Sequence, residues 1–283
     1  MKNKICIVTG ANTGIGKATA AGLASLGAEV IMICRNKEKG EEAKRQIIKQ
    51  TKNELVHLLV ADLSSMNEIK KLSEEIHNKF SKIDVLINNA GIILHQRQVT
   101  VDGYEYQFAA NYLSNVLLIH LLMDLLLKAS PSRIINVSSG AHRGVGINFN
   151  DLHSEKDYQY LRVYSMTKLS QILFTYKLAK ELNGTGITVN ALSPGVVATN
   201  LLSDFQGKPR ALGFIHKLKN DNPEKGAETP LYLATSDEVK NISGKYFANK
   251  KVEETSMSSY DQNTTDRLWN ESLKLCGITK FGS

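Results

Sequence analysis

The sequence of 283 residues predicts an α/β protein with one doubly wound parallel sheet of seven strands. Short runs of β-branched residues alternate with longer segments that carry apolar residues at helical spacing. The short runs are mostly apolar, which is typical of parallel strands covered by helices on both faces. A glycine-rich segment connects the first run to the first helical segment, as in sheets that bind nucleotides.

Each element follows from its own pattern, in chain order. Strands are expected at Ile5–Val8, Glu29–Ile33, Val56–Val60, Val85–Ile87, Arg133–Val137, Thr188–Leu192 and Lys245–Ala248. Helical periodicity predicts helices near 15–26, 37–50, 66–80, 103–128, 162–183 and 224–235. The strict βα alternation predicts a single Rossmann-type catalytic domain over residues 1–250, with 251–283 as a polar C-terminal tail of the same domain.

Two segments interrupt the alternation, each just after a predicted strand. Residues 140–161 and 200–223 are rich in loop-forming residues, and long loops at this end of such a sheet border the ligand crevice. We expect both to line the substrate site. The second segment carries Leu201, Leu202, Phe205, Leu212 and Phe214, which either line an apolar pocket or anchor a lid helix.

Composition narrows the class of partner. The net charge is +7, but lysines are scattered singly, so we expect solvated helix faces and no nucleic-acid partner. Cys6, Cys34 and Cys276 have no metal-ligand spacing, and neither do the histidines, so no metal is expected. The few cysteines favour a reducing compartment.

The hydropathy pattern bears on location. The first strand begins almost at the N-terminus, which leaves no room for a signal peptide. No run of about 18 apolar residues occurs, so no integral membrane anchor is expected. The expected protein is soluble and cytoplasmic.

The first strand ends in a glycine-rich loop that opens directly into a helix. Such glycines let the backbone turn tightly around a pyrophosphate, whose charge the helix N-terminal amides stabilise. The spacing is Gly-x-x-x-Gly-x-Gly, so a plain strand-to-helix turn is the alternative that its position argues against. The residues expected to bind a dinucleotide here are Gly10, Asn12, Thr13, Gly14, Ile15 and Gly16.

The end of the second strand bears on the choice of cofactor. An NAD site would place a carboxylate near there for the ribose 2′-hydroxyl, whereas this chain has Arg35 and Asn36. A guanidinium can hold a 2′-phosphate through two hydrogen bonds. NADPH is therefore expected over NADH, with an exposed turn arginine as the alternative.

A tyrosine and a lysine four residues apart on a helix share one face and form a candidate proton donor. Bringing a tyrosine pKa from about 10 to about 7 requires roughly 4 kcal/mol. An ammonium about 4 Å away supplies that at an effective dielectric near 20. The spacing occurs three times, at Tyr164/Lys168, Tyr176/Lys180 and Tyr246/Lys250. Only Tyr164 begins a helix that follows a strand ending in serines, so we expect it to be the proton donor.

The serines at that strand end are the candidate oxyanion donors. A hydroxyl there can donate to a substrate carbonyl oxygen as charge develops on it. A routine turn cap is the alternative for Ser138 and Ser139. The nearby Tyr164/Lys168 pair favours the catalytic role for one of them.

Together, these residues resemble the short-chain dehydrogenase/reductase family over the chain to about residue 250. The resemblance implies catalytic roles for Asn111, Ser139, Tyr164 and Lys168, with Ser139 preferred because the family uses the second serine of such a pair. It implies that Tyr164 and Lys168 also contact the cofactor and that Asn111 holds a water in the proton relay. Further cofactor contacts implied by matching motifs are Asp62, Leu63, Asn89, Ala90, Gly91, Pro194, Gly195, Val197 and Thr199.

A narrower likeness is to the retinol-dehydrogenase-like branch. It rests on residues 34–36, 147–152 and 168–174, and on the 25-residue separation of Ser139 from Tyr164. The resemblance implies an NADP-dependent enzyme that interconverts a small-molecule carbonyl, lipophilic or retinoid-like, and its alcohol. The chain departs from the branch around Asn111 and at Thr167.

Several alternatives stay open at this point. A catalytically idle NADP-binding protein of the same fold is the second hypothesis, because fold alone does not establish chemistry. A nucleotide-sugar epimerase would need a larger C-terminal substrate domain. Homo-oligomers are common in the family, often through the helices expected at 103–128 and 162–183, while the branch is frequently monomeric. The sequence determines neither the substrate, the direction, nor the oligomeric state.

Overall fold

The computed structural model describes residues 1–195 and 222–282 and contains one eight-stranded sheet. The strands are β1 (Ile5–Thr9), β2 (Glu29–Cys34), β3 (Val56–Val60), β4 (Val85–Asn88), β5 (Ser132–Val137), β6 (Ile187–Ser193), β7 (Tyr246–Ala248) and β8 (Lys251–Val252). Their order in the sheet is β3-β2-β1-β4-β5-β6-β7-β8. The predicted doubly wound α/β fold is confirmed.

The expected count of seven strands is wrong by one. The seven predicted strands pair in parallel, and β8 adds to the edge as an antiparallel partner of β7. A turn with positive φ at Asn249 and Lys250 reverses the chain between them. Because β8 has only two residues, both exposed, it carries no apolar run that would predict a strand.

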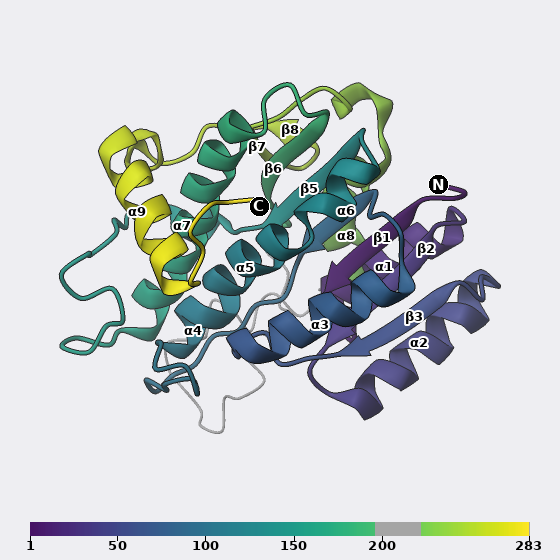
Figure 1. Ribbon diagram of the computed structural model, residues 1–283, viewed down its shortest axis with the longest axis horizontal. Coiled ribbons are helices and arrows are strands. Elements are labelled where there is room, and N and C mark those ends of the chain that lie inside the picture. Colours follow the sequence, from purple (N-terminus) through teal and green to yellow (C-terminus); the bar gives the residue numbers. More distant parts are fainter. Residues whose placement is uncertain (196–221, 283) are drawn as a thin grey trace.

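Helices cover both faces of the sheet (Figure 1). One face packs against α1 (Gly14–Ser25), α2 (Lys37–Thr51) and α8 (Pro223–Thr235), and the other against α3 (Met66–Lys79), α5 (Ser114–Leu121), α6 (Met123–Lys128) and α7 (Tyr160–Glu181). Burial explains the apolar strands. In β1, Cys6 and Val8 face the first layer, while Ile7 faces the second, and all three are fully buried.

The helix expected over 103–128 is interrupted. It consists of the short α4 (Tyr106–Phe108), a π-helical turn η1 (Ala109–Leu113), α5 and α6. Single π turns inside helices are frequent at functional sites. Asn111 lies within this turn.

The C-terminal tail is a built part of the fold. It forms the 3-10 turn η7 (Met257–Tyr260) and then α9 (Gln262–Leu275), which lies beside α7 in Figure 1. The rings of Trp269 and Phe174 stack with centroids 5.3 Å apart, and Phe281 packs against both. The buried apolar residues Leu268 and Trp269 on an otherwise polar helix explain why α9 packs against α7.

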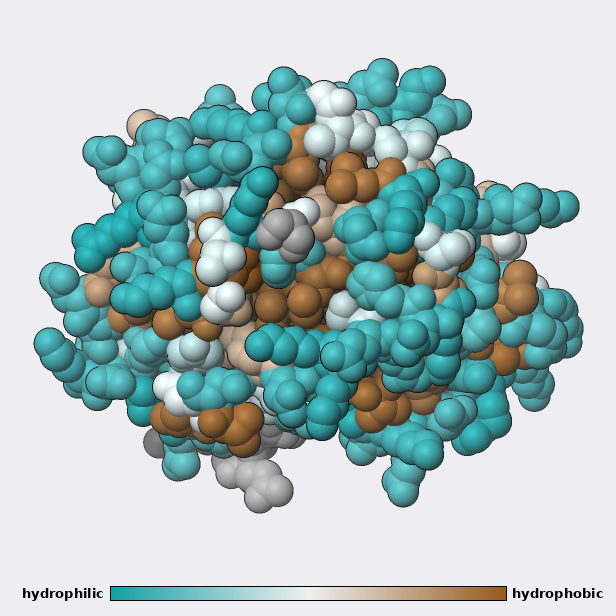
Figure 2. Space-filling view, in the orientation of Figure 1, coloured by the Kyte–Doolittle hydropathy of each residue, from teal (hydrophilic) through white to brown (hydrophobic). Residues whose placement is uncertain are grey.

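The face of the molecule drawn in Figure 2 is largely hydrophilic. Figure 2 shows hydrophilic residues around a central apolar area on the face that carries α5 and α6. Within residues 1–195 and 222–282, the helices are too short or too polar to cross a lipid bilayer.

Candidate active site

The glycine loop after β1 has the shape of a phosphate cradle. Gly10 and Gly14 have φ of +65° and +53°, which favour glycine. A Cβ on Gly10 would lie 2.9 Å from Cα of Ala90, and one on Gly16 would collide with the Gly10 carbonyl oxygen. The first turn of α1 carries Lys17 and no carboxylate. The loop therefore fits the pyrophosphate of a dinucleotide at a helix N-terminus.

A hydrogen-bonded junction fixes this loop to the end of β4. The Thr9 hydroxyl accepts from the amides of Asn89 and Ala90, both at 2.9 Å, and the Asn89 side chain donates to the Thr9 carbonyl at 2.8 Å. Asn89, expected as a cofactor contact, thus has a structural role in its side chain. Thr9 was not singled out by sequence, because its partners lie 80 residues away.

The second cofactor region gathers three side chains from separate elements. Arg35 at the end of β2 donates to the Tyr106 hydroxyl at 2.5 Å, and that hydroxyl donates to Asp62 at 3.3 Å. The Arg35–Asp62 ion pair measures 3.6 Å, and the Arg35 side chain is 59% exposed. The Arg35 guanidinium is therefore held by Tyr106 and Asp62 but remains accessible to solvent. Asn36 caps α2 by accepting from the Lys39 amide at 2.8 Å.

The two serines after β5 have different contacts. The Ser138 hydroxyl is buried and donates to the Lys168 carbonyl at 2.8 Å, which ties α7 to the sheet. The Ser139 hydroxyl forms a hydrogen bond with Tyr164 and also accepts from the Ala141 amide at 3.2 Å. The structure brings Ser139, not Ser138, to the Tyr164 hydroxyl.

Lys168 lies beside the Tyr164 ring and is almost fully buried. Its ammonium is 5.5 Å from the centroid of the Tyr164 ring. It donates to the Val137 carbonyl at 2.9 Å and to Oε1 of Gln171 at 3.2 Å. In the described part of the chain it has no carboxylate partner, and burial lowers its pKa to about 7. A Cβ on Gly91 would be 3.7 Å from this ammonium, so the end of β4 borders it.

The expectation that Lys168 brings the Tyr164 pKa toward neutrality is wrong. Burial raises the pKa of Tyr164 to about 12, the nearby Tyr246 hydroxyl adds to the rise, and the hydrogen bond from Ser139 only partly opposes it. Burial disfavours the charged form of each group, which raises the pKa of the tyrosine and lowers the pKa of the lysine. Tyr164 is consequently protonated at neutral pH, which is the form that donates a proton.

Asn111 is fixed by the π turn and its neighbours. Its Oδ1 accepts from the Ile92 amide at 2.8 Å, and its Nδ2 donates to the Ile92 carbonyl at 3.0 Å and to the Thr167 hydroxyl at 3.3 Å. Thr167 in turn donates to the Tyr164 carbonyl at 2.7 Å. The side chain of Asn111 thus joins the loop after β4 to the first turns of α7.

The segment after Ser139 is held by the C-terminal tail. The buried His142 has Nδ1 at 2.7 Å from the Ser139 carbonyl and Nε2 at 3.2 Å from the Ser256 amide. Since a carbonyl only accepts and an amide only donates, His142 is neutral with its proton on Nδ1. Burial lowers its pKa, which favours that form. Ser258 also donates to the Val145 carbonyl at 3.0 Å.

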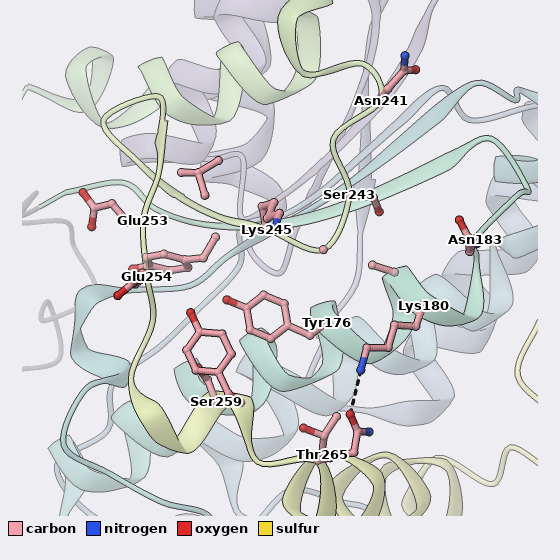
Figure 3. A pocket seen from close by; sticks show the side chains of 16 residues that line it. Tyr176, Lys180, Asn183, Asn241, Ser243, Lys245, Glu253, Glu254, Ser259 and Thr265 are labelled. Atoms are coloured by element: carbon pink, nitrogen blue, oxygen red, sulfur yellow. Dashed lines mark hydrogen bonds between the residues drawn. The ribbon is translucent and has the colours of Figure 1, made fainter.

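The tyrosines of the other two Tyr–Lys pairs, Tyr176 and Tyr246, form hydrogen bonds with residues outside the Ser139–Tyr164–Lys168 group. Tyr176 bonds the Thr255 hydroxyl at 3.0 Å and stacks on Tyr260, while Lys180 donates to Gln262 at 2.9 Å. Figure 3 shows Tyr176 and Lys180 in a polar pocket of about 920 Å³ between α7, the β7–β8 hairpin and the C-terminal segment. Tyr246 is in β7 and forms a hydrogen bond with Ser193. Lys180 and Lys250 thus have partners of their own, Gln262 and Glu228, although the Tyr246 ring itself lies near Tyr164.

The remaining predicted residues divide into two groups. Pro194 and Gly195 follow the end of β6, and Gly195 has φ of +85°. Leu63 is buried beside Asp62. Val197, Thr199 and the apolar residues proposed for the second substrate segment lie outside the described residues. No cluster of metal-ligating side chains occurs within residues 1–195 and 222–282.

These observations define a nicotinamide-dependent oxidoreductase: a parallel sheet, a phosphate loop after its first strand, and a Ser–Tyr–Lys group at the same strand ends. The sequence comparisons make the class specific. A model of the short chain dehydrogenase family matches residues 4–209. The chain belongs to that family, in its retinol-dehydrogenase-like branch.

Two human relatives cover nearly the whole chain. It is 41% identical to retinol dehydrogenase 13 over 281 residues, which is 97% of this chain and 85% of the relative. It is 39% identical to retinol dehydrogenase 14 over 297 aligned residues, or 99% and 88% of the two chains. The protein is therefore an enzyme that interconverts carbonyls and alcohols with a nicotinamide cofactor.

Solved structures agree with the fold. An uncharacterised protein from Mycobacterium paratuberculosis superposes with a TM-score of 0.80 at 30% identity, over 98% of this chain and 94% of its own. A Beutenbergia cavernae structure, described as an NAD(P)-dependent gluconate 5-dehydrogenase with NADP at low occupancy, gives 0.69 at 26% identity, over 88% and 95%.

Proposed function

We propose that this enzyme is an NADP(H)-dependent reductase of lipophilic carbonyl compounds, with Tyr164 as the proton donor. The observation that carries the proposal is the convergence of Ser139, Tyr164 and the buried Lys168 at the strand ends that also carry the glycine loop. When bound, the reduced nicotinamide supplies the hydride.

The roles of the protein groups follow from their contacts. Ser139 donates to the substrate oxygen and stabilises the charge that develops on it. Tyr164 transfers its proton to the same oxygen. Lys168 would hold the cofactor ribose and, in its charged form, stabilises the tyrosinate left behind. Asn111 fixes the backbone around them through Ile92 and Thr167.

The preference for NADP rests on Arg35. A 2′-phosphate carries two negative charges that a guanidinium can meet with paired hydrogen bonds. The Tyr106 hydroxyl accepts a hydrogen bond from Arg35 and so orients the guanidinium. The pair with Asp62 is long and half-exposed, so a phosphate can compete for the guanidinium at little cost.

The proposal for substrate class rests on the relatives, which are named for retinol, a lipophilic alcohol. Reduction requires Tyr164 to start in its protonated form, and its raised pKa keeps it in that form. A second possibility on the same fold is a protein that binds NADP without turnover. The complete catalytic group argues against it.

The experiment is a panel of carbonyls with NADPH and NADH, followed by nicotinamide absorbance. We expect turnover of retinaldehyde and nonanal with NADPH, and weaker turnover of a small hydrophilic ketone. Tight NADPH binding with no turnover of any compound would favour the idle protein. Faster turnover with NADH would contradict the cofactor assignment.

A further inference from the structure

Gln171 lies one helical turn beyond Lys168 on α7, with only 1% of its surface exposed. Its two amide atoms have different partners. Oε1 accepts from the Lys168 ammonium at 3.2 Å, and Nε2 donates to the main-chain carbonyl of Asn111 at 2.8 Å. The side chain therefore connects the catalytic lysine directly to the π turn.

The chemistry of the partners fixes the orientation of this amide. An ammonium only donates and a carbonyl only accepts, so a flipped amide would oppose both groups. The arrangement thus has one satisfied form. Burial of a polar amide costs free energy unless such bonds are made, so both contacts matter to the fold as well.

The Asn111 carbonyl also accepts a hydrogen bond from a second side-chain amide. Nδ2 of Asn115 donates to it at 3.2 Å. A carbonyl oxygen has two lone pairs, and here two side-chain amides use them. A relay water bound to this carbonyl would have to displace one of these amides.

The backbone at Gln171 is itself anchored to the sheet. Thr175 donates from its hydroxyl to the Gln171 carbonyl at 2.7 Å, and Asn136 of β5 donates to that hydroxyl at 2.9 Å. The backbone of Gln171 is consequently held in position, and its side chain can fix the position of the Lys168 ammonium.

We propose that Gln171 is a positioning residue that holds the Lys168 ammonium in place and occupies the site on the Asn111 carbonyl where a relay water would bind. The link between lysine and asparagine then runs through a neutral amide, which orients the ammonium without neutralising its charge. Because Lys168 acts on the tyrosine and on the cofactor ribose, the inference rests on the proposed function.

Gln171→Leu and Gln171→Ala test the proposal together. Leucine fills the space with apolar atoms, while alanine leaves room for a water that can bridge Lys168 and Asn111. We expect Gln171→Leu to lower kcat about tenfold with little change in the substrate KM, since Gln171 does not touch the substrate. We expect Gln171→Ala to retain more activity than Gln171→Leu. We also expect the NADPH Kd to rise more in Gln171→Leu than in Gln171→Ala.

A purely packing role gives another order. The volume-conserving leucine would then be the milder change and the cavity-forming alanine the more harmful one. That order, or wild-type kcat and NADPH Kd in both variants, would overturn the proposal. Asn190→Leu is the matched control, because Asn190 is a buried amide of β6 with two hydrogen bonds, at 2.6 and 3.0 Å, away from the site. It should lower Tm and leave kcat unchanged.

NADPH affinity separates this inference from the proposed function. If the wild-type protein turns over no carbonyl, the function fails, and NADPH affinity still tests Gln171 through Lys168. If Gln171→Leu yields no folded protein, Gln171→Met replaces it, since its unbranched chain fits irregular space. The expected order against alanine is the same.

Discussion

The Lys168 ammonium lies 5.5 Å from the centroid of the Tyr164 ring, while its hydrogen bonds go to Val137 and Gln171. The lysine is thus held beside the tyrosine by groups that do not titrate. Burial without a carboxylate partner lowers the pKa of Lys168 from 10.5 to about 7. This relationship has consequences for stability as well as for catalysis.

The first prediction concerns stability against pH. Between pH 7 and 10 the unfolded chain keeps a proton on Lys168 that the folded chain has lost, so this residue makes stability rise with pH. The slope is about 1.4 kcal/mol per pH unit, and it disappears below pH 7, where both states are protonated. Lys168→Met removes it.

The measurement is Tm of wild type and Lys168→Met across that pH range, without nucleotide. The Tm of the wild type minus the Tm of the variant should increase as pH rises. The contributions of all other titratable groups cancel in this difference. Parallel curves would show that Lys168 is charged in the folded protein at every pH tested.

The second prediction concerns cofactor choice. Arg35→Asp should reverse the preference from NADPH to NADH, because a carboxylate repels a 2′-phosphate and accepts from a 2′-hydroxyl. Tyr106→Phe removes the hydroxyl that holds Arg35 and should weaken NADPH binding several-fold with little effect on NADH. The ratio of kcat/KM values for the two cofactors measures both. An unchanged ratio in Arg35→Asp would rule out the arginine as the discriminating group.

The third prediction concerns the link from the C-terminal segment to the active site. His142→Phe keeps a ring against Tyr246, where the centroids are 5.1 Å apart, but loses the bonds to Ser139 and Ser256. We expect kcat to fall about tenfold because Ser139 loses its support.

His57→Phe is the control for that variant. His57 is a partly exposed histidine of β3 that bonds Glu29 and packs edge-on against Phe80. Its replacement should leave kcat unchanged. Equal effects of the two changes on kcat would show that the loss is general and not transmitted through Ser139.

Local patterns predicted most of the fold. The seven parallel strands are short, mostly apolar runs that can be recognised without tertiary information. The antiparallel β8 and the apolar stripe of α9 were missed because their role depends on distant partners, such as the Phe174 ring under Trp269. The π turn was missed for a similar reason, since nothing in its composition distinguishes it from an α-helix.

The site was predictable where a residue type and its position along the chain carry the chemistry. Ser139, Tyr164 and Lys168 are of this kind. The pKa of Tyr164 was not, because it depends on burial that no spacing reveals. The contacts of Gln171 and His142 are likewise set by chain segments 60 and 114 residues away.

The fourth prediction is the most direct test of the central claim, that Tyr164 donates the proton. It compares Tyr164→Phe with Tyr176→Phe, its matched control on the same helix, by steady-state reduction with NADPH and by NADPH binding. Loss of a general acid costs on the order of 10²–10⁴ in rate. We predict that Tyr164→Phe loses turnover by that factor with NADPH affinity nearly retained, while Tyr176→Phe keeps its activity. An active Tyr164→Phe alongside an inactive Tyr176→Phe would contradict the assignment.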